Sequence, residues 1–122
     1  MASVRYMVDE PATARDFYVE HFGFAVVEEW GGAMIIIKRG DLSLWLAGPD
    51  TSAAKPMPDG RKPTPGGWNR IVVEVDDIDA TVARLKAASA TFRNEVIKGP
   101  GGSQVLVEDP SGNPIEIFQP RG

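Results

Sequence analysis

The chain contains an internal repeat, and this feature constrains its fold more than any other. The segment Val8-Asp9-Glu10 aligns with Val75-Asp76-Asp77, and in both halves it joins an alternating apolar stretch to a helical pattern. The elements predicted after this junction also follow the same order twice. Half of a 122-residue chain buries little core by itself, so the two halves must share a core or pair with another chain.

The first half predicts a strand, a helix and three strands. Alternating residues around Tyr6 predict the first strand, and the helical spacing of ARDFYVEHF predicts a helix capped by Asp9 and ended by Gly23. Three further strand patterns follow, at residues 24–30, 33–39 and 41–47. We therefore predict a first βαβββ module over residues 1–47.

Residues 48–67 are rich in Pro, Gly, Ser and Lys and show no periodicity, which predicts a linker or flap. The pattern then restarts with a strand at 69–75 and a helix at 77–88, capped by Asp76 or Asp77. Three strands complete this second βαβββ module, residues 68–122, at 92–98, 104–109 and 114–120. The chain is thus predicted to form one α+β domain, residues 1–122, built from two tandem modules.

In each module one helix covers one face of four strands and leaves the other face concave. Strand alternation assigns ten residues to that face: Ser3, Arg5, Met7, Ser43, Trp45, Arg70, Val72, Glu74, Glu116 and Phe118. This mixture of polar and aromatic side chains suits a ligand cleft better than a core. With Trp68, which lies beside the linker and could act as a lid or pack at an edge, the predicted ligand-binding residues are Arg5, Met7, Trp45, Trp68, Arg70, Glu74, Glu116 and Phe118.

Composition excludes several classes of protein. The net charge of −4 argues against nucleic-acid binding, which needs a basic face to neutralise phosphates. The chain has no cysteine, so disulfides and thiolate zinc sites are excluded. The N-terminal residues contain no apolar run of the length that a signal peptide or a membrane span needs, so we expect a cytoplasmic protein that does not enter membranes.

Three segments carry a family resemblance. VDEPATARDFYVEHFGF, VEVDDIDATVARLKAA and LVEDPSGNPIEIFQP are similar to the vicinal oxygen chelate superfamily, which includes glyoxalases, bleomycin-resistance proteins and extradiol dioxygenases. The resemblance covers nearly the whole chain, and the DPSGNPIEIF turn and strand is its most specific part. It implies paired βαβββ modules whose curved mixed sheets wall a cleft, usually in a homodimer.

The resemblance also implies where a metal would bind. Metal-using members hold a divalent cation through His, Glu or Gln side chains on the first, fourth, fifth and eighth strands, and the matching positions here are Ser3, Trp45, Arg70 and Glu116. Only Glu116 could be a ligand, because indole offers no lone pair and a guanidinium repels a cation. The single histidine, His21, falls on the first predicted helix, outside the cleft. We therefore expect no metal site and no other cofactor.

These observations favour a metal-free binding protein of the antibiotic-resistance type, without catalytic residues. It would sequester an aromatic or polycyclic natural product in a cleft at a dimer interface. Trp45 and Phe118 would pack on the ligand, Arg5, Arg70 and Glu116 would make polar contacts, and the linker would close over it. The sequence also fits an internal Arg70–Glu116 ion pair that fills the vacated metal position, and a Trp45 that plugs the cleft or lies at a subunit interface.

Three other functions stay open. A metal-free enzyme of small-molecule or natural-product metabolism could use Glu74 or Glu116 as a base and Arg70 to stabilise an oxyanion. A metal-dependent lyase or dioxygenase would need ligands other than those expected here. A purely structural dimer would fill the cleft with its own side chains. Two arrangements of the modules fit the sequence: they pair within one chain, or they swap between two chains.

Overall fold

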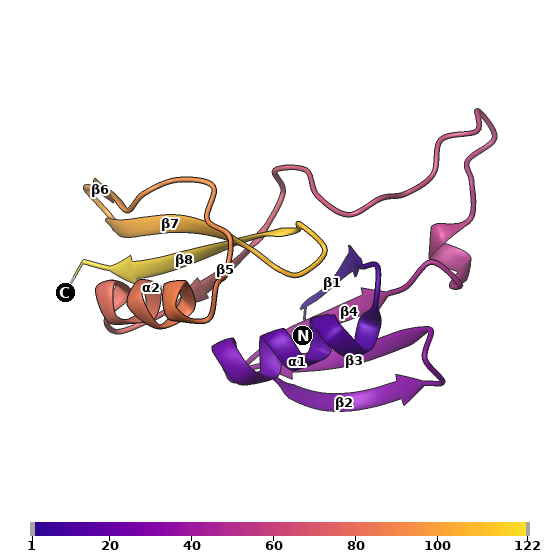
Figure 1. Ribbon diagram of the computed structural model, residues 1–122, viewed down its shortest axis with the longest axis horizontal. Coiled ribbons are helices and arrows are strands. Elements are labelled where there is room, and N and C mark those ends of the chain that lie inside the picture. The colour runs from indigo at the N-terminus through magenta and orange to yellow at the C-terminus, as the bar shows by residue number, and fades with distance from the viewer. Residues whose placement is uncertain (1, 122) are drawn as a thin grey trace. The chain divides into compact units, whose positions relative to one another are not determined.

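A computed structural model describes residues 2–121, in which the strand–helix–strand–strand–strand order occurs twice (Figure 1). The elements are β1 (Ala2–Met7), α1 (Pro11–Phe22), β2 (Ala25–Trp30), β3 (Met34–Arg39), β4 (Leu42–Ala47), the short 3-10 helix η1 (Ser52–Ala54), β5 (Ile71–Glu74), α2 (Ile78–Ala87), β6 (Ile97–Gly99), β7 (Gly102–Glu108) and β8 (Pro114–Pro120). The predicted α+β fold with two βαβββ modules is confirmed. No helix among residues 2–121 is long and apolar enough to cross a membrane.

The chain forms two compact units. The first unit comprises Met1–Gly66 together with Pro110–Asn113, and the second comprises Gly67–Asp109 together with Pro114–Gly122. The turn between β7 and β8 therefore belongs to the first unit, although both strands belong to the second.

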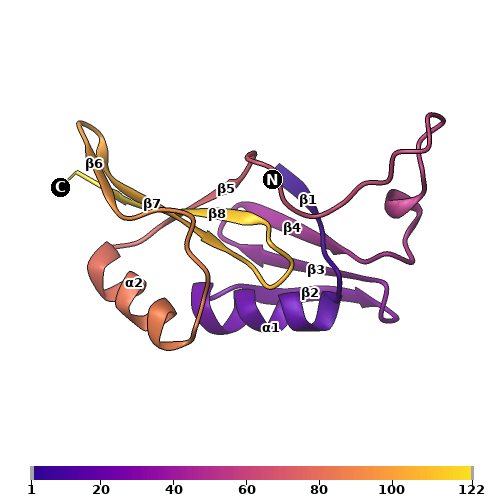
Figure 2. The same ribbon diagram turned by 45° about the horizontal axis from the view of Figure 1, so that its top comes forward.

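In the first unit the strands lie in the order β1-β4-β3-β2, with β1 and β4 parallel and the other pairs antiparallel. Helix α1 runs along one face of this sheet (Figure 2). Leu44 and Leu46 are fully buried, as is Tyr18 of the helix. The alternation of β4 thus packs its leucines against α1 and directs Ser43 and Trp45 to the other face.

The second unit repeats this arrangement as β5-β8-β7-β6, with β5 and β8 parallel. The buried residues Val73, Ile115 and Ile117 come from alternate positions of β5 and β8, and Leu85 of α2 is fully buried. The positions between them, including Val72, Glu116 and Phe118, lie on the opposite face. Both units therefore have an apolar helix side and an open side of mixed character.

The two helices begin differently. Asp77 caps α2, because its carboxylate accepts a hydrogen bond from the Ala80 N–H at 3.0 Å. The prediction that Asp9 caps α1 is wrong: the N-cap is Glu10, and no side chain makes the capping hydrogen bond. Pro11 causes the shift, because it occupies the first helical position and makes its predecessor the cap. The Asp9 N–H instead donates to the Ser111 hydroxyl at 2.9 Å.

The predicted strand at 92–98 is also wrong for most of its length. Only Ile97–Gly99 forms a strand, while Phe92 makes one isolated bridge to Val107. The cause is Asn94, whose side-chain oxygen accepts a hydrogen bond from the Leu106 N–H at 2.9 Å. A side chain thereby takes the place of a main-chain partner, and the ladder is interrupted.

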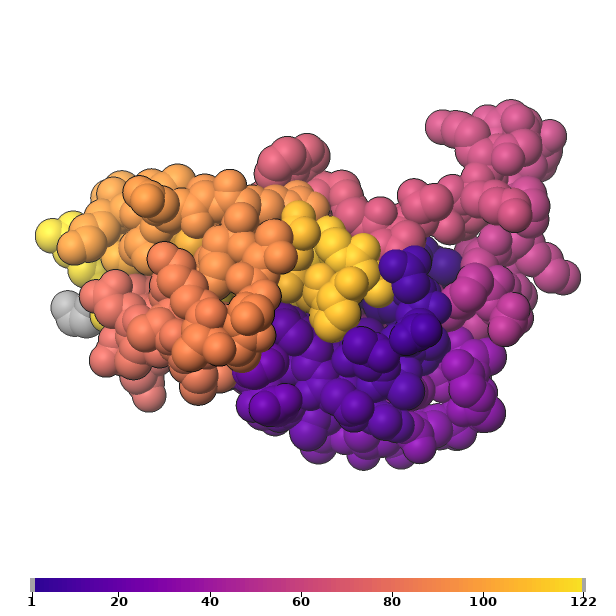
Figure 3. All heavy atoms as spheres, viewed as in Figure 1, coloured from indigo at the N-terminus to yellow at the C-terminus, as the bar shows by residue number. Residues whose placement is uncertain are grey.

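The segment at 48–67 contains η1 and is otherwise irregular. Figure 3 shows the middle of this segment standing clear of the rest of the first unit. Its start is tightly packed, because the Gly48 N–H donates to the Ala33 carbonyl at 2.9 Å. A Cβ at Gly48 would lie 2.9 Å from a side-chain carbon of Pro11, so only glycine fits there.

Candidate functional site

The open face of the first unit carries a tryptophan stacked by an arginine. Arg5 and Trp45 are direct partners across the parallel β1–β4 pair, so their side chains share a face. The Arg5 guanidinium carbon lies 5.1 Å from the centroid of the indole ring, which is cation–π distance. The indole N–H donates to the Ser43 hydroxyl at 3.1 Å. The half-buried Trp45 ring is therefore held in one orientation by two neighbours.

An apolar row lies beside this stack. Met7 is the register partner of Ala47, which in turn faces Met34 on β3. Trp45 faces Ile36 in the same way. The alternation of β3 therefore places Met34 and Ile36 on the open face. Arg5, Met7 and Trp45 thus occupy one face of the first unit.

The open face of the second unit carries an ion pair. The Arg70 Nη2 and Nε atoms lie 2.8 and 3.1 Å from Oε1 of Glu116. Arg70 also donates from Nη1 to the Trp68 carbonyl at 3.3 Å. The Glu116 residue is 9% exposed, so its charge is sheltered from water and compensated by the guanidinium. Two hydrogen bonds to one carboxylate make this pair strong and fix its geometry.

The remaining predicted residues of the second unit lie on that same face. In the β5–β8 register Val72 faces Glu116 and Glu74 faces Phe118. Glu74 is exposed and Phe118 is half-buried. Trp68 precedes β5 and is 68% exposed. The structure thus places each predicted residue on the open side of its own unit or beside it, while their joint role in binding stays a prediction.

Sequence reasoning missed two polar residues that organise these regions. Arg93 pairs with Glu108 and covers one face of the Trp68 ring. Asn113, which is 3% exposed, donates to the Met7 carbonyl at 2.7 Å and accepts from the Gly66 N–H at 2.8 Å. The DPSGNP turn pattern signalled an ordered turn but not this use of its asparagine. Residues 92–98 were predicted to be a strand, and strand alternation gives no sign that Arg93 contacts Trp68.

The residues at the positions that match the superfamily's metal ligands do not fit a divalent cation. The Glu116 carboxylate is bonded to Arg70, and the Trp45 nitrogen uses its hydrogen on Ser43 and has no lone pair. Among residues 2–121, no group of three or more His, Cys, Asp or Glu side chains could hold a metal ion. His21 lies on α1, where its ring packs 5.0 Å from that of Phe17.

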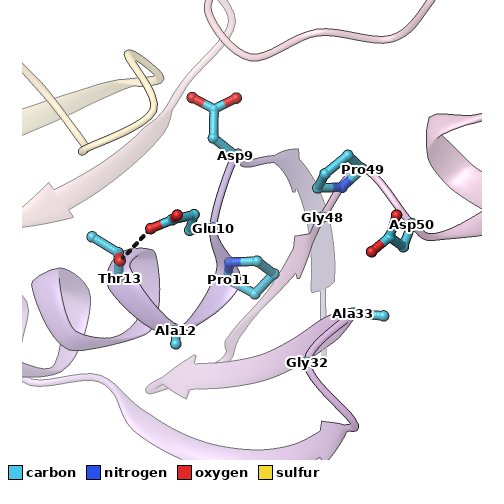
Figure 4. Close-up of a pocket in the computed structure, with 10 residues that line it drawn as sticks. All are labelled: Asp9, Glu10, Pro11, Ala12, Thr13, Gly32, Ala33, Gly48, Pro49 and Asp50. Atoms are coloured by element: carbon cyan, nitrogen blue, oxygen red, sulfur yellow. Dashed lines mark hydrogen bonds between the residues drawn. The ribbon is translucent and has the colours of Figure 1, made fainter.

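A separate pocket of about 320 Å³ lies at the start of α1 (Figure 4). Its walls come from the turn before the helix, from residues 32–33 and from the segment after β4, and they carry the carboxylates of Asp9, Glu10 and Asp50. Thr13 donates to Glu10 at 3.1 Å across one side. None of the residues predicted to bind ligand lines this pocket.

Comparisons with known proteins identify the family. Residues 1–117 match the Glyoxalase/Bleomycin resistance protein/Dioxygenase superfamily, and the chain belongs to it. No curated protein matches the sequence significantly.

Solved structures include three informative relatives. TnmS3, an antibiotic binding protein from Streptomyces sp. CB03234, is 29% identical with a TM-score of 0.73, over 98% of this chain and 93% of that one. A superfamily member from Sphaerobacter thermophilus is 25% identical with a TM-score of 0.76, and the match covers 98% of this chain and 95% of that one. Lactoylglutathione lyase from Agrobacterium tumefaciens is 22% identical with a TM-score of 0.74, and the match covers 98% of this chain and 92% of that one. This similarity supports the fold alone.

Proposed function

We propose that this chain is a small-molecule-binding protein of the antibiotic-sequestering type, and that its ligand is an aromatic or polycyclic natural product. The observation that carries this proposal is the Arg5–Trp45 stack on the open face of the first unit. A rigid indole on a partly polar sheet face offers a large contact area to a flat ligand at little cost in side-chain entropy. The similarity to an antibiotic binding protein supports the antibiotic-sequestering part of this proposal.

The proposal gives the other residues distinct roles. Phe118 and Met7 add apolar contact area, and Met7 adapts to irregular ligand shapes because its side chain is flexible. Arg70 and Glu116 offer polar contacts from within a hydrogen-bonded pair. A compensated pair costs less to cover with a ligand than a single unpaired charge does. The segment at 48–67 would close over the bound molecule.

Isothermal titration calorimetry against a panel of aromatic antibiotics tests the proposal. We expect at least one member to bind, and Trp45→Ala to weaken that binding by at least about tenfold, because it removes the stacking surface. Val19→Ala, an exposed position on α1 away from the open face, is the control and should leave the affinity unchanged. Failure of every member to bind, together with turnover of a small metabolite by the purified protein, would show an enzyme instead.

We further propose that the protein acts as a homodimer with its ligand at the subunit interface. The family resemblance supports this arrangement. So does the edge strand β2, where Val26 and Val27 are 46% and 55% exposed, because an exposed apolar edge favours association with another chain. Analytical ultracentrifugation at micromolar concentration should give the mass of two chains, and a single-chain mass in the presence of ligand would contradict the proposal.

A further inference from the structure

The side chain of Arg93 connects three parts of the second unit. Its Nε lies 2.9 Å from Oε2 of Glu108, and its Nη1 donates to the Gly67 carbonyl at 2.6 Å. Its guanidinium carbon lies 4.6 Å from the centroid of the Trp68 ring. The Arg93 N–H also donates to the Leu106 carbonyl at 2.9 Å. The residue is therefore anchored to β7 through both its backbone and its side chain.

Trp68 is exposed and yet held in place. Its side chain projects from the end of an irregular segment, where large apolar residues are normally mobile or covered. Here the carbonyls of Gly67 and Trp68 accept hydrogen bonds from Arg93 and Arg70, respectively. The guanidinium of Arg93 covers one face of the ring, and the residue as a whole is still 68% exposed. These contacts fix the backbone and the ring together.

The charges around this ring suggest the kind of ligand that it accepts. Arg93 is compensated by Glu108 and Arg70 by Glu116, so the cluster has no excess charge to attract an ion. The guanidinium on the covered face draws π-electron density toward itself. The uncovered face is then less negative than that of an isolated indole, and it attracts a cation less strongly.

We propose that Arg93 positions Trp68 as a preformed stacking platform for an uncharged planar aromatic ring, and selects against a cationic ring of the same shape. This inference rests on the proposed function, because it assumes that the ligand is aromatic. It adds an aromatic contact to those proposed for Trp45 and Phe118, and a positioning residue, Arg93, that no sequence pattern marked. Arg93 acts through Trp68 and need not touch the ligand.

A first experiment needs no ligand. In a Trp30→Phe/Trp45→Phe background Trp68 is the single tryptophan, and its nanosecond fluorescence anisotropy reports the motion of that ring. We expect Arg93→Gln to lower the anisotropy and Arg93→Lys to preserve most of it, since lysine retains a cation over the ring. If loss of the partner of Glu108 unfolds the single variant, Arg93→Gln/Glu108→Gln removes both charges together. Unchanged anisotropy in a folded charge-free variant would overturn the positioning role.

A second experiment compares acridone, which is uncharged, with 10-methylacridinium, which has the same ring skeleton and a permanent charge. Calorimetry should show that the native protein binds acridone more tightly, by about threefold. Arg93→Gln should reduce this preference, and Trp68→Ala should weaken acridone binding by about tenfold. Equal or tighter binding of the acridinium ion to the native protein would overturn the proposed selectivity.

Two further outcomes separate this inference from the proposed function. Acridone binding that is unaffected by Trp68→Ala would overturn the platform and leave the proposed function intact. Failure of both probes and of the antibiotic panel to bind would overturn the proposed function and the ligand role of Trp68 with it. Protection of Trp68 from acrylamide quenching as protein concentration rises would show that the ring packs against a second copy, and would also overturn the platform.

Discussion

At the scale of single residues, guanidinium groups organise the open faces of both units. Arg5 stacks on Trp45, Arg70 holds Glu116, and Arg93 holds Glu108 while it covers Trp68. Arginine suits these tasks because its planar, permanently charged fork can stack on a ring and donate several hydrogen bonds at once. Lysine would keep the charge and lose the planar geometry.

The Arg70–Glu116 pair should be coupled. Arg70→Met removes the cation from a carboxylate whose side chain is only 12% exposed, and we expect a loss of about 1–3 kcal/mol in the free energy of unfolding. The double variant Arg70→Met/Glu116→Leu should regain most of that loss, because no uncompensated charge is left on the sheet. Urea denaturation of the single and double variants measures the coupling. Losses that simply add would show that the pair is not energetically linked.

Asn113 should matter more than its neighbours in the same turn. Asn113→Ala leaves the Met7 carbonyl and the Gly66 N–H, both in half-buried residues, without the partners that they have here. Each hydrogen bond lost costs about 0.5–1.5 kcal/mol. Thermal and urea denaturation should therefore show a large loss of stability. Ser111→Ala removes one exposed hydrogen bond from the Asp9 N–H and is the matched control, with an expected loss of less than about 1 kcal/mol. Equal losses in the two variants would contradict this role of Asn113.

At the scale of elements, alternation and helical spacing were sufficient to predict the fold. The leucines of β4 and the isoleucines of β8 alternate with polar or aromatic residues, so the pattern revealed which side of each strand is buried. Errors arose where a side chain competes with the backbone or a proline sets the boundary. Asn94 takes a hydrogen bond that a strand at 92–98 would have made, and Pro11 moves the cap of α1 to Glu10.

The candidate site was predictable to the extent that it follows from strand alternation. Arg5, Met7 and Trp45 share a face because period-two alternation and parallel pairing require it. The contact between Trp68 and Arg93 follows from no local pattern, because it joins a loop to an irregular segment 25 positions away (93 − 68 = 25). Such contacts depend on the tertiary path of the chain, and only the structure shows them.

The cap of α2 provides a test at this scale. Asp77→Ala removes the carboxylate that accepts from the Ala80 N–H, and we expect a loss of about 1 kcal/mol in the free energy of unfolding. Asp76→Ala changes the adjacent carboxylate, outside the cap position, and is the control. Circular dichroism during thermal unfolding should show a lower melting temperature for the first variant alone. The sequence could not distinguish these two aspartates, so a reversed result would also overturn the assigned start of the helix.

At the scale of the whole molecule, the duplication provides each unit with its own sheet, helix and buried core. In each unit the helix covers one face of the sheet and leaves the other open, and the two open faces carry different chemistry. In the first unit a hydroxyl and an arginine hold an indole, whereas in the second an arginine neutralises a carboxylate. The repeat therefore preserves the fold while the two open faces have diverged.

The irregular segment at 48–67 should be the first place where a protease cuts. Trypsin cleaves after lysine and arginine, but Lys55 and Lys62 both precede proline, where cleavage is poor. Arg61 precedes a lysine, and its side chain is 85% exposed, with Nε 2.7 Å from Oδ2 of Asp59. Exposed irregular segments open with little loss of packing, whereas Lys38 and Arg39 lie in the hydrogen-bonded ladder of β3.

We therefore expect limited trypsin digestion to produce fragments 1–61 and 62–122 first, as identified by mass spectrometry. Arg61→Gln should leave the chain intact over the same period. If the segment closes over a bound molecule as proposed, a saturating aromatic ligand should slow the cut after Arg61. A cut engineered by Ala88→Lys, at the exposed C-terminal end of α2 and away from the proposed ligand contacts, serves as the internal reference. A ligand that binds without slowing cleavage after Arg61 would show that the segment does not close. A first cut after Arg39 or Lys98 in the free protein would show that the sheets open more readily than the segment does.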